Sequence, residues 1–261
     1  MFQIADHGRV RVLTFDRPEA LNAMNNDLYW ACADALTAAA DDPGVAVVVL
    51  TGNGRAFCAG QDIGEMSAAA TDPRGHGFGP FADGLAEFRK PVIAAVNGLG
   101  IGIGATMLPF CDLVVMADTV RLKLPFPTLG VAPEAGSSYT FPATLGLQQA
   151  AYFLYTAEWM TADVALAAGL AFRVVPHSAL LDETLALAQQ IAAMPIASLV
   201  ATKALIVAAR RDAVRAARAR EDEVFRHLIG GPANLEAITA FFEKRPADFT
   251  TLPPFTDLPL P

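Results

Sequence analysis

One covered strand does most to limit what this chain can fold into. Residues 45–51, Val-Ala-Val-Val-Val-Leu-Thr, form an unbroken apolar run between Pro43-Gly44 and Gly52-Asn53-Gly54. A short β-branched run without alternation is typical of a strand that is buried on both faces, as in layered α/β proteins. Further strands are predicted at 10–15, 91–96 and 112–117, so we expect an α/β fold.

Helical periodicity dominates the second half of the chain. Apolar spacing predicts helices at 26–40, 147–156, 161–168, 179–193, 196–210 and 211–228. With 261 residues and 53% hydrophobic content, the chain is long enough to bury a large core in one domain. The segment 71–80 is rich in glycine and proline and is predicted to be a turn-rich lid.

Composition excludes several classes of partner. A net charge of −8 argues against a nucleic-acid binder, which would need a basic face. The twenty residues 92–111 carry no charge, but four glycines interrupt them, so we expect no membrane span. The first seven residues lack the features of a signal peptide, which favours a cytoplasmic protein.

Cysteine and histidine usage does not predict a metal site. Cys32, Cys58 and Cys111 lie in apolar segments and are interpreted as small hydrophobic residues in a reducing compartment. Cys58 has no charged neighbour in the sequence to stabilise a thiolate, which argues against a nucleophile. None of the four histidines has metal-ligand spacing, so we expect no metal.

A glycine-rich segment follows the strand at 91–96. Residues 100–105 match the dinucleotide-binding pattern G-x-G-x-x-A, but the acidic residue expected about twenty positions later would fall near Arg121, not at a carboxylate. We therefore favour glycines that allow close backbone approach over glycines that bind a pyrophosphate.

A second segment of small residues, 55–66, follows directly on the strand at 45–51 and is expected to expose backbone N–H groups. Together with residues 97–106 it resembles the enoyl-CoA hydratase/isomerase family, also called the crotonase family. The resemblance implies a crotonase (ClpP-like) spiral of repeated ββα units over residues 1–195. It also implies a C-terminal helical layer at 196–261 that completes the site and forms a homotrimer, or a hexamer of two trimers.

The same resemblance implies an acyl-CoA substrate, with coenzyme A present as part of the substrate and no bound cofactor. The backbone N–H groups of Ala59 and Ile103 would form an oxyanion hole for the thioester oxygen. The residues implied in substrate and coenzyme A binding are Glu19, Ala20, Leu21, Ala59, Gly60, Gln61, Asp62, Ile63, Phe241 and Lys244. From the sequence alone, Asp62 is interpreted as a helix cap, and Phe241 and Lys244 as the end of an exposed helix.

One carboxylate distinguishes the possible reactions. Hydratases of this family use two glutamates, and Thr106 and Phe126 occupy their positions here. The segment 129–142 instead resembles the peroxisomal-type Δ3,Δ2-enoyl-CoA isomerases, in which the glutamate at the position of Glu134 is the catalytic base. Apolar neighbours would raise the pKa of Glu134 toward a useful range, although a glutamate in the first turn of a helix also interacts favourably with the helix dipole.

The sequence therefore predicts an enoyl-CoA isomerase of fatty-acid oxidation, which moves a double bond from the 3- to the 2-position through a dienolate. Two alternatives stay open. The chain could be a 2-enoyl-CoA hydratase of the same family, or an acyl-CoA-binding protein without catalytic activity.

Overall fold

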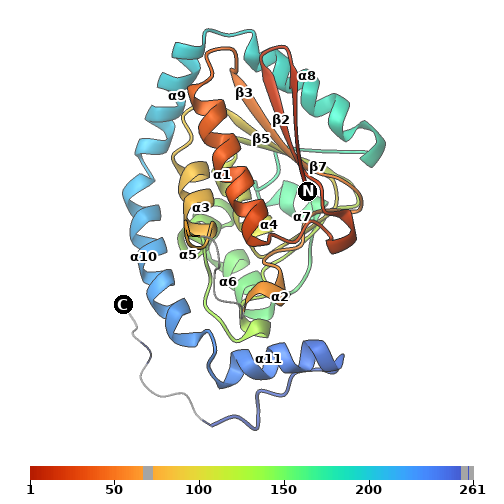
Figure 1. Cartoon of the computed structure of the whole chain (residues 1–261), viewed down its shortest axis with the longest axis vertical. Coiled ribbons are helices and arrows are strands. Elements are labelled where there is room, and N and C mark those ends of the chain that lie inside the picture. Colours follow the sequence, from red (N-terminus) through yellow and green to blue (C-terminus); the bar gives the residue numbers. More distant parts are fainter. Residues whose placement is uncertain (67–72, 254–257, 259–261) are drawn as a thin grey trace.

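The computed structural model describes residues 1–66, 73–253 and 258, and its centre is a six-stranded sheet (Figure 1). The order of its strands is β1 (Phe2–His7), β2 (Val10–Phe15), β3 (Val47–Gly52), β5 (Val92–Val96), β7 (Leu113–Ala117) and β10 (Arg173–Val175). β1 and β2 pair antiparallel, and the other neighbours pair in parallel.

The chain also forms a smaller four-stranded sheet, whose strands alternate along the sequence with strands of the large sheet. Its order is β4 (Ala56–Cys58), β6 (Leu99–Ile101), β8 (Arg121–Lys123) and β9 (Met160–Thr161). β3 leads to β4, β5 to β6 and β7 to β8, so each repeating unit contributes one strand to each of the two sheets. Repetition of this unit winds the chain into a spiral.

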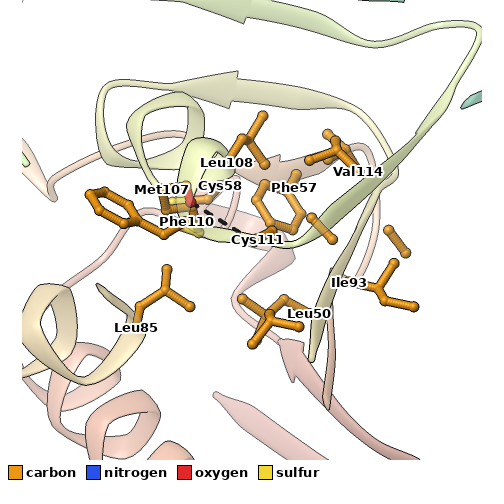
Figure 2. Packing of buried hydrophobic residues seen from close by; sticks show 14 of the residues in the cluster. Leu50, Phe57, Cys58, Leu85, Ile93, Met107, Leu108, Phe110, Cys111 and Val114 are labelled. Carbon is orange, nitrogen blue, oxygen red and sulfur yellow. Dashed lines mark hydrogen bonds between the residues drawn. The ribbon is translucent and has the colours of Figure 1, made fainter. Parts of the chain in front are cut away.

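The central strands are buried on both faces. Every residue of β5 and the first five residues of β3 are buried, which is the burial that their unbroken apolar sequences predict. Helix α8 (Leu180–Ala192) packs against β2, β3, β5 and β7. Figure 2 shows Leu50 and Ile93 from the large sheet in the same buried cluster as Phe57, Leu108 and Phe110.

Helices surround the two sheets. Near the N-terminal hairpin, α1 (Asn26–Asp41) begins where the Asn25 side chain accepts a hydrogen bond from the Leu28 N–H. The remaining helices are α2 (Ile63–Met66), α3 (Phe78–Ala86), α4 (Ile103–Thr106), α5 (Ser137–Leu145), α6 (Leu147–Thr156), α7 (Ala162–Ala167), α9 (Ile196–Ala208), α10 (Arg211–Leu228) and α11 (Pro232–Glu243). Short 3-10 helices lie at Pro18–Ala20, Leu108–Phe110, Pro127–Leu129 and His177–Ala179.

Two glycines allow the backbones of β4 and β6 to meet. A Cβ atom at Gly104 would lie 2.0 Å from the carbonyl oxygen of Cys58, and one at Gly98 would lie 2.1 Å from that of Arg55. Neither distance is possible for a real side chain, so both positions require glycine. The glycine run therefore serves close packing, as the sequence interpretation favoured.

The predicted elements agree with the structure where the local pattern is long. The strand at 10–15 and the helices at 147–156 and 211–228 coincide with β2, α6 and α10, and the strand predicted at 45–51 lies at Val47–Gly52. The turn-rich segment predicted at 71–80 extends too far, because α3 begins at Phe78 and packs against α1 through Tyr29 and Phe81; a role as a lid stays a prediction. Residues 71 and 72 lie outside the described part of the chain.

Within the described ranges, no single helix is long and apolar enough to cross a membrane. The stretch from His177 to Ala192 and α9 meet that test only as a pair, across a bend of 104°.

A buried cation attaches the C-terminal helices to the core. α9 and α10 run along one side of the molecule in Figure 1, and Lys203 of α9 reaches inward. Its Nζ lies 2.7 Å from Asp112 Oδ2 and 2.9 Å from the carbonyl oxygen of Lys90. Asp112 Oδ2 also accepts a hydrogen bond from the Val92 N–H, so this ion pair joins α9 to β5 and β7.

Replacing Lys203 by methionine keeps most of the apolar stem but leaves Asp112 without its charge partner. We expect the free energy of unfolding to fall by about 2 kcal/mol, because the hydrogen bonds of the buried ammonium to Asp112 and Lys90 are lost, while the Asp112 carboxylate stays partly in contact with water. Chemical denaturation measures this change. The control is Arg173→Met, which removes an exposed pair with Glu183 and should cost less than about 1 kcal/mol. Equal losses in the two variants would contradict the role given to Lys203.

Candidate active site

Two strand ends bring the predicted oxyanion segments together. β4 pairs in parallel with β6, with Cys58 opposite Gly100, so residues 59–62 and 102–104 leave the small sheet side by side. A Cβ atom at Gly60 would lie 3.0 Å from the carbonyl oxygen of Ile101, and Gly60 has a φ of +94°, which favours glycine. Both segments therefore reach the same edge of the sheet through their backbones.

The structure corrects one of the two predicted oxyanion donors. The N–H of Ala59 donates to the carbonyl oxygen of Leu21 at 3.0 Å, so it is already used within the fold. The segment 59–62 runs beside residues 21–24, where Met24 N–H donates to Gly60 and Asp62 N–H donates to Met24. This pairing leaves the N–H of Gln61 without an acceptor among the described residues.

Ile103 supplies the other backbone donor. It is the first residue of α4, where helix geometry leaves N–H groups without an intrahelical acceptor. Within the described part of the chain its N–H has no hydrogen-bond partner, whereas the preceding Gly102 N–H donates to Lys123. The geometry therefore favours Gln61 and Ile103, rather than Ala59 and Ile103, as the pair of available amides.

The Glu134 side chain contacts α4, the helix that begins at Ile103. Thr106, in the single turn of α4 that Ile103 begins, donates its hydroxyl hydrogen bond to Glu134 Oε1 at 3.1 Å. Glu134 precedes α5, and its own carbonyl oxygen accepts the Ser137 N–H at 3.0 Å. The predicted carboxylate is thus held beside the element that carries one of the available amides.

The surroundings of Glu134 raise its pKa to about 7. Burial is the main cause, because a carboxylate withdrawn from water is disfavoured. The charges of Glu221 and Asp222 raise the pKa further, while the Thr106 hydrogen bond and the positive charge of Arg218 lower it. Near neutral pH both protonation states of Glu134 are populated, as proton transfer in either direction requires.

Tyr29 is a site neighbour that the sequence did not predict. Its ring lies on the buried face of α1 against His76, Phe78 and Phe81. Burial raises the pKa of its hydroxyl, and the negative charge of Glu134 raises that pKa further. Nothing in the apolar spacing of this helix distinguishes Tyr29 from a core residue.

Four buried side-chain polar atoms have no hydrogen-bond partner among the described residues: Tyr29 Oη, Gln61 Nε2, Ser137 Oγ and Thr140 Oγ1. They come from α1, from the segment after β4 that carries the Gln61 amide, and from α5, which begins three residues after Glu134. Unpaired buried polar atoms are costly and are usually satisfied by water or a ligand. Their concentration here is typical of a ligand-binding region.

Cys58 is also buried at this site. Burial raises the pKa of its thiol to about 12, so it stays protonated and is not an activated nucleophile. This agrees with the sequence interpretation of Cys58 as a small hydrophobic residue. Among the described residues, no group of three or more histidine, cysteine and acidic side chains is arranged to hold a metal ion.

The residues implied in coenzyme A binding fall into two groups. Glu19, Ala20 and Leu21 lie at the 3-10 helix whose end contacts Ala59 through Leu21, so they adjoin residues 59–63. Asp62 accepts the Gly64 N–H at 3.1 Å, as predicted for a helix cap, and forms an ion pair with Arg17 at 3.1 Å.

Phe241 and Lys244 lie apart from the first group, at the end of α11. The side chain of Phe241 is exposed, and Lys244 has a left-handed backbone at the end of the helix. α11 packs against the 3-10 helix Pro127–Leu129, which precedes Glu134 in the chain, and Asn234 donates to the carbonyl oxygen of Leu129 at 2.9 Å. Their proposed contact with coenzyme A stays a prediction.

Comparison with known proteins places this arrangement in a family. A sequence model described as enoyl-CoA hydratase/isomerase matches residues 6–252. The chain is 37% identical to 2,3-dehydroadipyl-CoA hydratase of Escherichia coli K12, over 92% of this chain and 95% of that protein. It is 31% identical to 1,2-epoxyphenylacetyl-CoA isomerase of the same organism, over 92% and 95%.

Solved structures agree with the sequence relatives. A crystal structure of an enoyl-CoA hydratase/isomerase from Pseudoalteromonas atlantica T6c superimposes with a TM-score of 0.92 at 34% identity, covering 95% of this chain and 99% of that chain. Among the curated relatives, hydratase is the commoner name.

Thr106→Val should raise the pKa of Glu134 above its value of about 7, because the lost hydrogen bond stabilised the ionised form. Titration of the side-chain carboxyl carbon by ¹³C NMR measures this directly. Thr51→Val makes the same change at a buried hydroxyl bonded to Ala95 and should leave the Glu134 titration where it is. A Glu134 pKa that falls or stays fixed in Thr106→Val would refute the contact.

Proposed function

Because the chain belongs to the enoyl-CoA hydratase/isomerase family and has its crotonase fold, we propose that it is an isomerase acting on 3-enoyl-CoA thioesters. The observation that carries this proposal is the hydrogen bond from Thr106 to Glu134. Through this bond one carboxylate, with a pKa of about 7, lies beside the short helix whose first N–H has no acceptor among the described residues.

In the proposed reaction Glu134 removes a proton from the α-carbon of the thioester. The electron pair of that C–H bond delocalises over the thioester carbonyl and the C3–C4 double bond, and gives a dienolate. The N–H groups of Gln61 and Ile103 would stabilise the negative oxygen, each contributing about 3 kcal/mol to the transition state. Glu134 then returns the proton to the γ-carbon, and the double bond lies between C2 and C3.

The residues at the two hydratase positions favour isomerisation over hydration. Thr106 uses its hydroxyl to bond Glu134, and Phe126 is a buried apolar ring. Neither side chain is a general base or acid for water. A 2-enoyl-CoA hydratase is nevertheless the second candidate, because most of the named relatives are hydratases.

The remaining assignments follow the family. We propose that Glu19–Leu21 and residues 59–63 bind the adenine end of coenzyme A, that α11 contributes Phe241 and Lys244, and that coenzyme A enters only as part of the substrate. We also propose a role in fatty-acid oxidation in the cytoplasm. The helical region from 196 onward would complete the site and form a trimer or hexamer; its exposed Leu205 and Ile206 are suited to such a contact.

Glu134→Gln should lower the rate of isomerisation by ~10²–10⁴, the usual contribution of a positioned general base. Glutamine preserves the volume and can still accept from Thr106, so the fold and ligand affinity should persist. The assay follows conversion of 3-hexenoyl-CoA to the 2-isomer. The control, Glu183→Gln, changes an exposed glutamate on α8 and should retain the wild-type rate. An active Glu134→Gln enzyme would remove Glu134 from catalysis.

A parallel incubation with 2-hexenoyl-CoA tests the choice of reaction. The isomerase hypothesis predicts little 3-hydroxyacyl-CoA, since no second carboxylate is assigned to activate water. Robust hydration by the purified wild-type protein would favour the hydratase alternative. Ligand binding without turnover of either substrate would favour the non-catalytic acyl-CoA binder.

Two proline substitutions test which amide contacts the thioester oxygen. Gln61→Pro removes the proposed donor and should reduce the shift of the thioester carbonyl band when an acyl-CoA binds. Ala59→Pro removes an N–H that already bonds Leu21, so it should lower stability while the band shift of bound ligand persists. Infrared difference spectra of the two bound variants measure the contrast. The opposite result would restore Ala59 as the donor.

A further inference from the structure

A buried carboxylate from the C-terminal helices supports the turn that carries Glu134. α10 is a strongly charged helix, yet one side of it faces the core through Val214, Ala217 and Glu221. These positions recur at intervals of three and four residues, so they form one stripe. Glu221 is only 5% exposed, which is rare for a glutamate unless hydrogen bonds satisfy it.

The Glu221 carboxylate bonds the backbone beyond Glu134. Oε2 accepts the N–H of Gly136 at 2.5 Å, and Oε1 accepts the N–H of Ser138 at 2.7 Å. Both N–H groups belong to the start of α5, where they have no acceptor within the helix. A capping side chain normally comes from the residue just before the helix, whereas this one lies more than eighty residues later in the chain.

The turn between Glu134 and α5 needs such support. Ala135 and Gly136 have φ values of +56° and +76°, so two consecutive residues are left-handed. The left-handed conformation costs an alanine roughly 1–2 kcal/mol and persists only where surrounding contacts hold it. At Gly136, a Cβ atom would lie 3.3 Å from side-chain atoms of Val214 and Arg218, so α10 packs directly on the turn.

We propose that Glu221 is a positioning residue for Glu134: its two hydrogen bonds fix the left-handed turn that aims the catalytic carboxylate. This inference rests on the catalytic role proposed for Glu134. Glu221 touches the backbone of the turn rather than the reacting atoms, so its effect on the reaction passes through Glu134.

Glu221 also adds a negative charge on the side of the turn facing α10. That charge raises the pKa of Glu134, together with the charge of Asp222, while Arg218 opposes them. From the other elements around Glu134, α4 contributes the Thr106 hydroxyl and α1 contributes Tyr29. Arg218 itself is paired with Asp83 of α3, which limits how far its charge offsets that of Glu221.

Glu221→Gln tests both effects. The amide oxygen can still accept one N–H, but the amide nitrogen cannot accept the other, and the charge is gone. We expect kcat for isomerisation to fall roughly 10–100-fold with little change in KM, as for a small displacement of a catalytic group. The pKa of Glu134, followed by ¹³C NMR and in the pH dependence of kcat, should fall below its wild-type value.

Asp222→Asn is the matched control, because it removes the same charge from the next residue of α10, whose carboxylate makes no hydrogen bond to the turn. It should lower the pKa of Glu134 less than Glu221→Gln does and leave kcat within about twofold, since a loss of field alone does not move the carboxylate. A folded Glu221→Gln protein with wild-type kcat and an unshifted Glu134 titration would overturn the proposal. Equal losses of kcat in the two variants would also overturn it, in favour of charge alone.

Glu221→Asp covers the case in which the glutamine variant does not fold. It keeps the charge but is one methylene shorter, so it should lower kcat while the Glu134 pKa stays closer to 7; wild-type kcat in this variant would overturn the positioning role. The NMR titration needs no turnover. If the wild-type protein proves not to isomerise 3-hexenoyl-CoA, the proposed function fails, yet the titration still decides whether Glu221 acts on Glu134.

Discussion

The contact between two backbones, at Gly98 and Gly104, is the constraint on which the site depends. Because neither position carries a side chain, β6 can pair with β4 and α4 can begin against the carbonyl oxygen of Cys58. That approach brings to the same edge of the small sheet the amides of Gln61 and Ile103, which have no acceptor in the part of the chain that the structure describes. The same helix then presents Thr106 to Glu134. A methyl group at Gly104 would force α4 away from β4. It would therefore disturb both the pair of amides and the position of the Glu134 carboxylate.

The electrostatic character of the site follows from a balance around one carboxyl group. Burial and two acidic residues of α10 favour the protonated form of Glu134, while a threonine hydroxyl and Arg218 favour the ionised form. Hydratase is the commoner name among the relatives, and at the two positions where family resemblance places glutamates this chain has a threonine and a buried phenylalanine. The change replaces a pair of carboxylates by a single carboxylate with a hydroxyl partner.

The sequence predicted the parts of the molecule whose signals are local. Long amphipathic helices such as α6 and α10 repeat their pattern over several turns, and β2 is a mainly apolar run of six residues. The strands of the small sheet have two or three residues each, which is too short for any period to emerge. The helix at Phe78–Ala86 was hidden by two glycines and a proline, and it forms because its aromatic residues pack on Tyr29.

Within the site, the sequence-based predictions were wrong or incomplete for one reason: the roles of these residues depend on contacts between segments that are far apart in the chain. Glu134 was selected because the segment 129–142 resembles that of the Δ3,Δ2-enoyl-CoA isomerases, but the choice between Ala59 and Gln61 depends on which amide is already bonded to residues 21–24. Tyr29 and Glu221 have no local signal at all, since only the fold brings α1 and α10 to Glu134. The order of synthesis gives this distance a consequence. Gln61, Ile103 and Glu134 are all synthesised before α10. The left-handed turn therefore lacks its hydrogen bonds to Glu221 until α10 has been made. A nascent chain that ends before α10 would therefore contain both amides and the Glu134 carboxylate, but the turn between Glu134 and α5 would still lack the two hydrogen bonds from Glu221.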